Sequence, residues 1–197
     1  VIYPPVAVQR FRADRPRGEF YLTVSRFVPY KRVDLTIAAF NQLGLPLVVI
    51  GAGELRANLE RIARPNIQFL GHQSDTVVVD YMERCKAFVF PAEEDFGITP
   101  VEAQAAGAPV IAYGRGGVAE SVIDGQTGLL FTAQTVEALV AAVDQFEHYP
   151  TAIAAPLIRQ HAERFSEERF CQEFQQLVTT QWSKFQQGAV HDWASLS

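Results

Sequence analysis

Two carboxylates, Glu94 and Glu102, are the first and last residues of a short stretch that reads EDFGITPVE. The apolar run at 87–91 just before them predicts a buried strand, and the Phe-Gly and Thr-Pro pairs between them predict a tight loop followed by a helix. This spacing leaves Glu94 on the loop and Glu102 in the first helical turn, so both acids can face one bound molecule. In open α/β sheets, loops at the carboxyl ends of strands hold ligands, and the N–H groups of a helix N-terminus bind phosphate. Carboxylates for hydroxyls and amides for phosphate together suit a nucleotide sugar.

A second interpretation of the same residues needs no ligand. Thr99, Pro100 and Glu102 fit a capping box, with threonine at the N-cap, proline at N1 and glutamate at N3. Glu102 would then only bind a backbone amide of its own helix. Glu94 is harder to explain without a ligand, although the Glu-Glu-Asp run at 93–95 also fits a solvated acidic loop. Gly97 would let a ligand approach the backbone closely. Both interpretations stay open at this level.

Cations follow the first predicted strand. Arg26 and Lys31 are separated by a loop that contains proline, and they can converge on a diphosphate, Arg as a fixed fork and Lys as a point charge. Taken alone, these cations fit a solvated surface loop better than a diphosphate site, and Arg32 fits the start of a helix. His72 follows the third predicted strand, where a lone histidine is more often a structural residue than a catalyst.

Two glycine-rich turns are weaker signals. Gly51 and Gly53 follow the second predicted strand, but the third glycine of the dinucleotide fingerprint is absent. A tight strand-to-helix turn is therefore favoured there over a phosphate cradle. The turn at 114–117, Gly-Arg-Gly-Gly, fits either a flexible crossover or a close approach of backbone to ligand.

Strand and helix patterns alternate along the chain. Short apolar runs predict strands at 20–24, 47–50, 67–70, 87–90, 109–113 and 127–131. Helical patterns separate these strands, and Ser74 is a candidate N-cap of the helix after the third strand. After Thr135 the pattern is helical, with breaks at Pro150 and near Ser166. This alternation predicts an α/β fold, a doubly wound, Rossmann-like parallel sheet with a helical C-terminal extension. We divide the chain into a Pro- and Arg-rich linker segment at 1–18, a domain at 19–180 and a C-terminal tail at 181–197.

Composition narrows the function classes. The 197 residues carry a net charge of −5 without a long basic run, which argues against a nucleic-acid partner. Cys85 and Cys171 lack a CxxC pattern, the four histidines are scattered, and no apolar stretch is long enough for a membrane span. We expect free thiols, no metal site and a cytoplasmic location.

The ordered motifs resemble the donor-binding domain of retaining GT-B glycosyltransferases, and especially the group 1 family that includes bacterial mannosyltransferases. The resemblance covers residues 1–180. Its motifs are Ser-Arg-x-x-Pro-x-Lys from Ser25, Gly-x-Gly from Gly51, Gly71-His72, Phe90-Pro91 followed by Glu-x-Phe-Gly-x-x-x-x-Glu from Glu94, Gly-Gly-x-x-Glu from Gly116 and Asp-Gly-x-x-Gly from Asp124. Ser25 stands where many relatives have glycine.

The resemblance implies a role for each matching residue. Arg26 and Lys31 correspond to the cations that neutralise the donor diphosphate and the departing nucleoside diphosphate. Glu94 corresponds to the acid that binds hydroxyls of the transferred sugar, and these three are the predicted catalytic residues. Because the departing diphosphate develops negative charge, placed cations and amides can stabilise the transition state without a metal.

The remaining predicted residues bind the donor. Glu102 corresponds to the acid that binds the ribose hydroxyls. Family members present backbone amides to the sugar and phosphate at the positions of Phe96, Gly97 and Ile98. Gly51 and Gly53 complete the predicted donor-binding set.

The resemblance also implies a substrate and a missing partner. We expect a hexosyltransferase that needs no cofactor and uses a nucleotide-diphosphate sugar as donor. GDP-mannose is the first candidate, because residues 29–34 resemble those of mannosyltransferases, and a UDP-sugar is the second. Family enzymes carry the acceptor site on a separate N-terminal domain, and Tyr3-Pro4-Pro5 resembles the start of their second domain. The chain is therefore expected to be a C-terminal half that binds donor without transferring sugar alone. The helices around 165–185 resemble those that pack back across the interdomain cleft, and membrane contact is expected only through the missing domain or the acceptor.

Three other functions remain as alternatives. A sugar-nucleotide epimerase has the same fold, and a binding-only nucleotide-sugar module would be completed by another chain. A dinucleotide dehydrogenase shares the architecture, but the incomplete glycine fingerprint argues against it.

Overall fold

The computed structural model describes residues 1–148 and 154–186, and it contains one six-stranded parallel sheet. The strand order is β3-β2-β1-β4-β5-β6, so the order reverses between β1 and β4. This is the doubly wound arrangement expected from the sequence, and that prediction is confirmed. The strands are β1 (Tyr21–Val24), β2 (Leu47–Ile50), β3 (Ile67–Gly71), β4 (Ala87–Phe90), β5 (Val110–Tyr113) and β6 (Gly128–Phe131).

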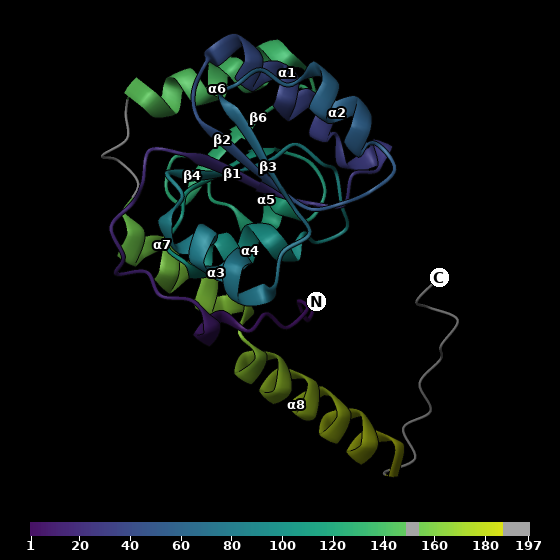
Figure 1. Cartoon of the computed structure of the whole chain (residues 1–197). Helices are drawn as coiled ribbons and strands as arrows, with labels where there is room; N and C mark the ends of the chain where they lie inside the picture. Colours follow the sequence, from purple (N-terminus) through teal and green to yellow (C-terminus); the bar gives the residue numbers. More distant parts are fainter. Residues whose placement is uncertain (149–153, 187–197) are drawn as a thin grey trace.

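Helices cover both faces of the sheet (Figure 1). One face carries α1 (Val33–Leu43), α2 (Arg56–Ile62) and α6 (Val136–His148). The other carries α3 (Asp75–Arg84), α4 (Ile98–Ala105), α5 (Val118–Ser121) and α7 (Ala155–Ala162). Alternate strand residues therefore enter different cores, so Tyr21 and Val49 lie in one and Leu22 and Val48 in the other. Burial on both faces explains why the strands are continuous apolar runs.

The chain continues beyond α7 through the short 3-10 helix η4 (Glu163–Phe165) into α8 (Glu167–Gln186). Ser166 has extended backbone between them, so the predicted break near Ser166 is confirmed; Pro150 lies outside the described residues. Figure 1 shows α8 leaving the sheet and its covering helices. The boundary that we predicted at residue 180 falls inside α8. None of the described helices is long and apolar enough to cross a membrane.

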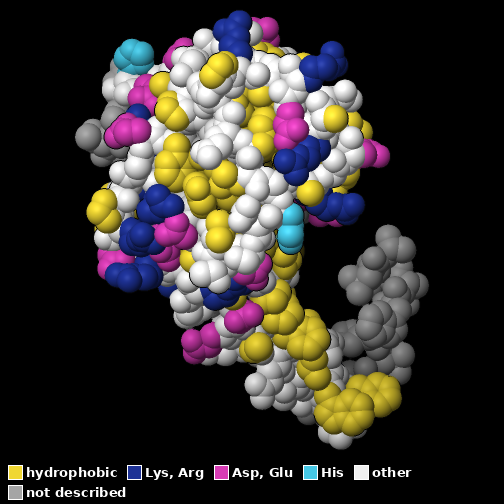
Figure 2. All heavy atoms as spheres, viewed as in Figure 1, with side chains coloured by type: hydrophobic (Ala, Val, Ile, Leu, Met, Phe, Trp, Pro, Cys, Tyr) yellow, Lys and Arg dark blue, Asp and Glu magenta, His cyan; other side chains and the backbone are white. Residues whose placement is uncertain are grey.

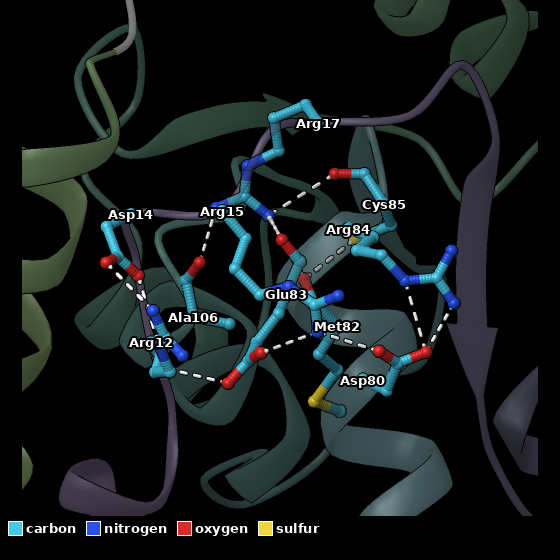
Figure 3. A network of polar contacts seen from close by, with 10 residues as sticks. All are labelled: Arg12, Asp14, Arg15, Arg17, Asp80, Met82, Glu83, Arg84, Cys85 and Ala106. Carbon is cyan, nitrogen blue, oxygen red and sulfur yellow. Dashed lines mark hydrogen bonds and ion pairs between the residues drawn. The ribbon is translucent and has the colours of Figure 1, made fainter.

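The segment at 1–18 has little regular structure, apart from the 3-10 helix η1 (Val8–Arg10), but it is packed firmly on the domain. Val6, Val8 and Phe11 are buried in the core beside α3 and α4. The Arg17 guanidinium donates to the carbonyl oxygens of Met82, Glu83 and Cys85 at 3.1, 3.1 and 3.4 Å, and to that of Ala106 (Figure 3). One guanidinium thus satisfies carbonyls at the C-terminal ends of both α3 and α4.

Helix starts differ in part from the sequence expectation. Ser74 is the N-cap residue of α3, but its hydroxyl makes no capping bond. Helix α4 begins at Ile98, with Gly97 as N-cap in the left-handed conformation at φ 80°. Of the two interpretations left open above, the capping box is therefore wrong, because the glycine turns the chain into the helix before Thr99 is reached.

Candidate functional site

A cleft of about 630 Å³ lies at the carboxyl ends of β1, β2, β3 and β4, next to the point where the strand order reverses. Its volume is in the range of ordinary ligand pockets, and its position is the one that open α/β sheets use for ligands. Four of the predicted site residues line it, namely Arg26, Lys31, Gly51 and Glu102.

A side hollow of about 550 Å³ adjoins this cleft. It is lined by Glu94, Phe96, Gly97 and Ile98, and Lys31 borders both spaces. The two spaces therefore form one continuous candidate site that turns at Lys31. Gly53 lines neither space.

The two predicted cations differ in their surroundings. Arg26 follows β1 and is exposed, and its guanidinium makes no hydrogen bond or ion pair with the residues that the structure describes. Lys31 ends the 3-10 helix η2 (Pro29–Lys31), where its ammonium pairs with the Glu94 carboxylate and lies 5.2 Å from the centroid of the Tyr30 ring. The pair links the loop after β1 to the loop after β4.

Glu102 projects from α4 into the cleft rather than capping its own helix. Within 1–148 and 154–186, its carboxylate has no hydrogen-bond partner. Burial raises the pKa of Glu102, Arg10 lowers this pKa by its charge, and Asp75 raises it. A half-buried carboxylate without an internal partner is suited to accept hydrogen bonds from hydroxyl groups of a ligand.

The loop that carries Glu94, residues 93–97, is called the acid loop below. Its backbone is fixed by the turn at 114–117: the Gly117 N–H donates to the Glu94 carbonyl oxygen at 2.8 Å. A Cβ atom at Gly116 would lie 2.3 Å from the same oxygen. These glycines therefore allow the turn to pack closely against the acid loop. From the sequence, a flexible crossover or a ligand contact is expected for this turn, and this packing role is not.

Gly51 and Gly53 allow a second close approach between loops. A Cβ atom at Gly51 would lie 1.8 Å from the Ser25 carbonyl oxygen, and one at Gly53 would lie 2.5 Å from that of Phe27. The loop after β2 thereby packs against the loop that carries Arg26. The tight-turn interpretation fits this geometry, while Gly51 also lines the cleft.

Residues that sequence reasoning did not select complete the cleft. Arg10, from η1, lines it and pairs with Asp75 at 3.1 Å, and Phe11 lines it as well. Arg10 belongs to no sequence motif. It reaches the cleft through the packing of the N-terminal segment, which the sequence pattern does not predict. His72 also lines the cleft and is exposed.

Arg32 turns away from the cleft. It is the N-cap of α1 in the left-handed conformation at φ 51°, and it contacts Asp34 and Gln134 at 3.3 and 3.1 Å. Its role at the helix start agrees with the sequence interpretation. In the part of the chain that the structure describes, no group of three or more His, Cys, Asp or Glu is placed to hold a metal ion.

Comparison with known proteins identifies the family. The profile described as "Glycosyl transferases group 1" matches residues 8–168. An uncharacterized glycosyltransferase from Methanocaldococcus jannaschii is 40% identical over 116 residues, 56% of this chain and 33% of that protein. A glycogen synthase from Mycobacterium tuberculosis is 32% identical over 178 residues, 83% of this chain and 41% of that protein. The structure of Anabaena HepE in complex with UDP and glucose matches with a TM-score of 0.79 at 21% identity, covering 91% of this chain and 56% of that chain.

These matches differ in what they show. The likeness to HepE, at 21% identity, shows the fold alone. The chain spans only 33% and 41% of the length of the two curated relatives. The family profile, however, extends from η1 to the first residues of α8 and so covers most of the chain. The chain therefore belongs to the group 1 family of glycosyl transferases.

Proposed function

We propose that this chain is the donor-binding part of a glycosyltransferase that uses a nucleoside diphosphate sugar. The observation that carries the proposal is the convergence of Arg26, Lys31 and Glu102 in one cleft, which continues past Lys31 to Glu94. Family membership supports the reaction class.

Glu102, Arg26 and Lys31 line the cleft, and Lys31 also lines the side hollow together with Glu94. We assign the ribose hydroxyls to Glu102, the diphosphate to Arg26 and Lys31, and the transferred sugar to Glu94 in the side hollow. The first N–H groups of α4 have no partner within the helix, so those near Gly97 and Ile98 are available to the sugar and phosphate.

The chemistry that these residues supply is electrostatic. When the bond from the sugar to the diphosphate breaks, negative charge develops on the departing nucleoside diphosphate. Arg26 and Lys31 stabilise that charge because both cations line the cleft in which it develops. Glu94 orients the sugar through its hydroxyls. Transfer with retention, without a metal or cofactor, remains the prediction drawn from the family resemblance.

The identity of the donor is the finer part of the proposal. We propose a hexosyl donor, with GDP-mannose as the first candidate because of residues 29–34 and a UDP-sugar as the second. Anabaena HepE, which shares the fold, was solved with UDP and glucose, and this supports the general class of ligand.

We further propose that a second domain supplies the acceptor site, since the relatives are much longer than this chain. Helix α8 offers a surface for it. Large apolar side chains gather along α8 (Figure 2), and the exposed ones are Phe174, Leu177, Val178, Trp182 and Phe185. This stripe would be covered by an N-terminal acceptor-binding domain. A cytoplasmic location stays a prediction.

Calorimetric titration of the chain with UDP-, GDP- and ADP-sugars tests the proposal. We expect one nucleotide series to bind, with the sugar nucleotide and the nucleoside diphosphate both bound more tightly than the nucleoside. Absence of binding to every member of the panel would overturn it. Incubation of a bound donor without acceptor tests the epimerase alternative, because only an epimerase turns the donor into its epimer under those conditions.

A further inference from the structure

Tyr3 contacts four separate parts of the molecule. Its ring stacks on Phe96 of the acid loop, with ring centroids 6.0 Å apart and an angle of 28° between the planes. The same ring meets Phe165 of η4 edge-on at 5.3 Å. Its hydroxyl donates to the Glu120 carboxylate of α5 at 2.9 Å, and its carbonyl oxygen accepts from Arg169 of α8 at 3.0 Å. The N-terminal segment, the acid loop, α5 and the start of α8 thus meet at one residue.

The acid loop is held from two sides, and Tyr3 forms one of them. The turn at 114–117 fixes the carbonyl of Glu94. The other end of the loop is held through Phe96, whose ring contacts both Tyr3 and Phe165; its centroid lies 6.0 Å from that of Tyr3 and 5.6 Å from that of Phe165. Gly97, the next residue, begins α4 at a φ of 80°. The direction of the first amides of α4 therefore depends on where the Phe96 ring is anchored.

The N-terminal segment also borders the side hollow directly. Pro4 lines this space together with Glu94, Phe96 and Gly97. The segment is fixed to the junction before α8 by a hydrogen bond of 2.8 Å from the Val6 N–H to the Phe165 carbonyl oxygen. A displacement of the segment would consequently move both the ring that supports Phe96 and one wall of the hollow.

We propose that Tyr3 is a positioning residue for the sugar end of the donor site. It acts through Phe96 and holds the backbone of 96–98 in the orientation that presents its amides to the side hollow. The proposal rests on the proposed function for its ligand, a nucleoside diphosphate sugar, but its structural part concerns the acid loop alone. A residue that merely filled the core would affect the nucleoside end and the sugar end of the site equally.

Three variants separate these roles. Tyr3→Leu removes the ring, whereas Tyr3→Phe keeps the ring and removes only the hydrogen bond to Glu120. Tyr81→Leu is the matched control, because Tyr81 on α3 packs edge-on against Phe20 at 5.6 Å and lines neither space of the site.

The first measurement is the set of NMR order parameters of the backbone amides of Phe96, Gly97 and Ile98, without nucleotide. We expect these order parameters to fall in Tyr3→Leu and to stay at wild-type values in Tyr3→Phe and Tyr81→Leu. The second measurement is the ratio of affinities for the nucleoside diphosphate sugar and the nucleoside diphosphate. We expect Tyr3→Leu to reduce this ratio by about tenfold, the upper range for an aromatic pair, and Tyr3→Phe to retain it.

The two measurements fail independently. If the wild-type chain binds no nucleoside diphosphate sugar, the proposed function fails, while the order parameters still test how the loop is held. Unchanged order parameters at 96–98 in Tyr3→Leu overturn the positioning role. A fall in order parameters spread evenly over the domain, matched by Tyr81→Leu, overturns it as well, because it would show general destabilisation.

Discussion

Lys31 and Glu94 form an ion pair in which the two side chains are only 18% and 21% exposed. The cation that we assign to the diphosphate and the acid that we assign to the sugar therefore neutralise each other. A bound diphosphate would compete with Glu94 for the Lys31 ammonium, while the sugar hydroxyls would offer Glu94 new partners. Affinity for the diphosphate and preference for the sugar are consequently linked through one contact.

The substitution Glu94→Gln should change these two affinities in opposite directions. With the carboxylate neutralised, Lys31 is free to bind phosphate, and the affinity for a nucleoside diphosphate should rise by about threefold to fivefold, the value of a partly exposed ion pair. The affinity for the nucleoside diphosphate sugar should not rise with it, because an amide accepts hydrogen bonds from the sugar hydroxyls more weakly. Calorimetric titration with both ligands measures the two effects.

Glu93→Gln provides the matched control for this substitution. It removes the same charge from the same loop, but Glu93 is exposed and makes no ion pair within the described residues. We expect its effect on diphosphate affinity to be smaller. Equal effects from Glu93→Gln and Glu94→Gln would mean that only the overall charge of the acid loop matters.

The substitutions Arg26→Ala and Lys31→Ala should weaken binding of diphosphate ligands by roughly tenfold each, the range of a charged hydrogen bond, and leave binding of the free nucleoside unchanged. Titration with the nucleoside and the nucleoside diphosphate measures the difference. Arg61→Ala is the control, since Arg61 is exposed at the end of α2 and lies outside both spaces of the site. Equal loss for the two ligands would contradict a diphosphate role.

The strands were predictable because each is a continuous apolar run that ends at a turn signal. Leu47–Ile50, for example, is followed by Gly51, whose φ of 143° and contact with Ser25 leave no room for a side chain. Parallel strands place their carboxyl ends at one edge of the sheet, so the neighbourhood of Arg26, Lys31 and Glu94 followed from topology. The sequence could not show that Lys31 and Glu94 pair, since this depends on the side-chain positions of two separate loops.

Other features lay beyond the sequence for identifiable reasons. Arg10 belongs to a segment without periodicity or motif, and only the burial of Val8 and Phe11 brings it to the cleft. The sequence left the start of α4 open because Thr99 and Glu102 have the spacing of a capping box, whereas Gly97 opens the helix through its backbone conformation. Local patterns predict elements, but they do not decide between two helix starts that lie this close together.

The substitution Glu102→Gln should stabilise the protein at neutral pH and weaken nucleotide binding. Burial raises the pKa of Glu102 above the ordinary value of 4.5, so folding favours its neutral form. The stabilisation of the neutral form is complete below the unfolded pKa and is lost as the pH rises through the folded pKa. Glutamine stays neutral at every pH. The melting temperature of the Glu102→Gln variant should therefore exceed that of the wild type at neutral pH, and this difference in melting temperature should vanish below the unfolded pKa of Glu102.

Nucleotide titration completes the test of Glu102. Loss of the carboxylate should weaken nucleoside binding by roughly 1–2 kcal/mol, because ribose hydroxyls lose a charged acceptor. Glu137→Gln, at an exposed position in the first turn of α6, should leave the affinity unchanged and lower the melting temperature slightly, because an acid near a helix N-terminus is stabilising. A Glu102→Gln variant with lowered stability and wild-type affinity would instead support a structural role for this acid.

The substitution Arg17→Met should destabilise the domain without altering the donor site. The Arg17 guanidinium satisfies carbonyl oxygens at the ends of α3 and α4, and methionine would fill similar space but leave them unpaired. We expect a loss of roughly 2–3 kcal/mol in the free energy of unfolding, measured in urea, with unchanged nucleotide affinity of the folded protein. Arg12→Met is the control, because the Arg12 side chain is 69% exposed and pairs only with Asp14. Equal midpoints of urea unfolding in the two variants would contradict a stabilising role for the contacts of Arg17 with these helix ends.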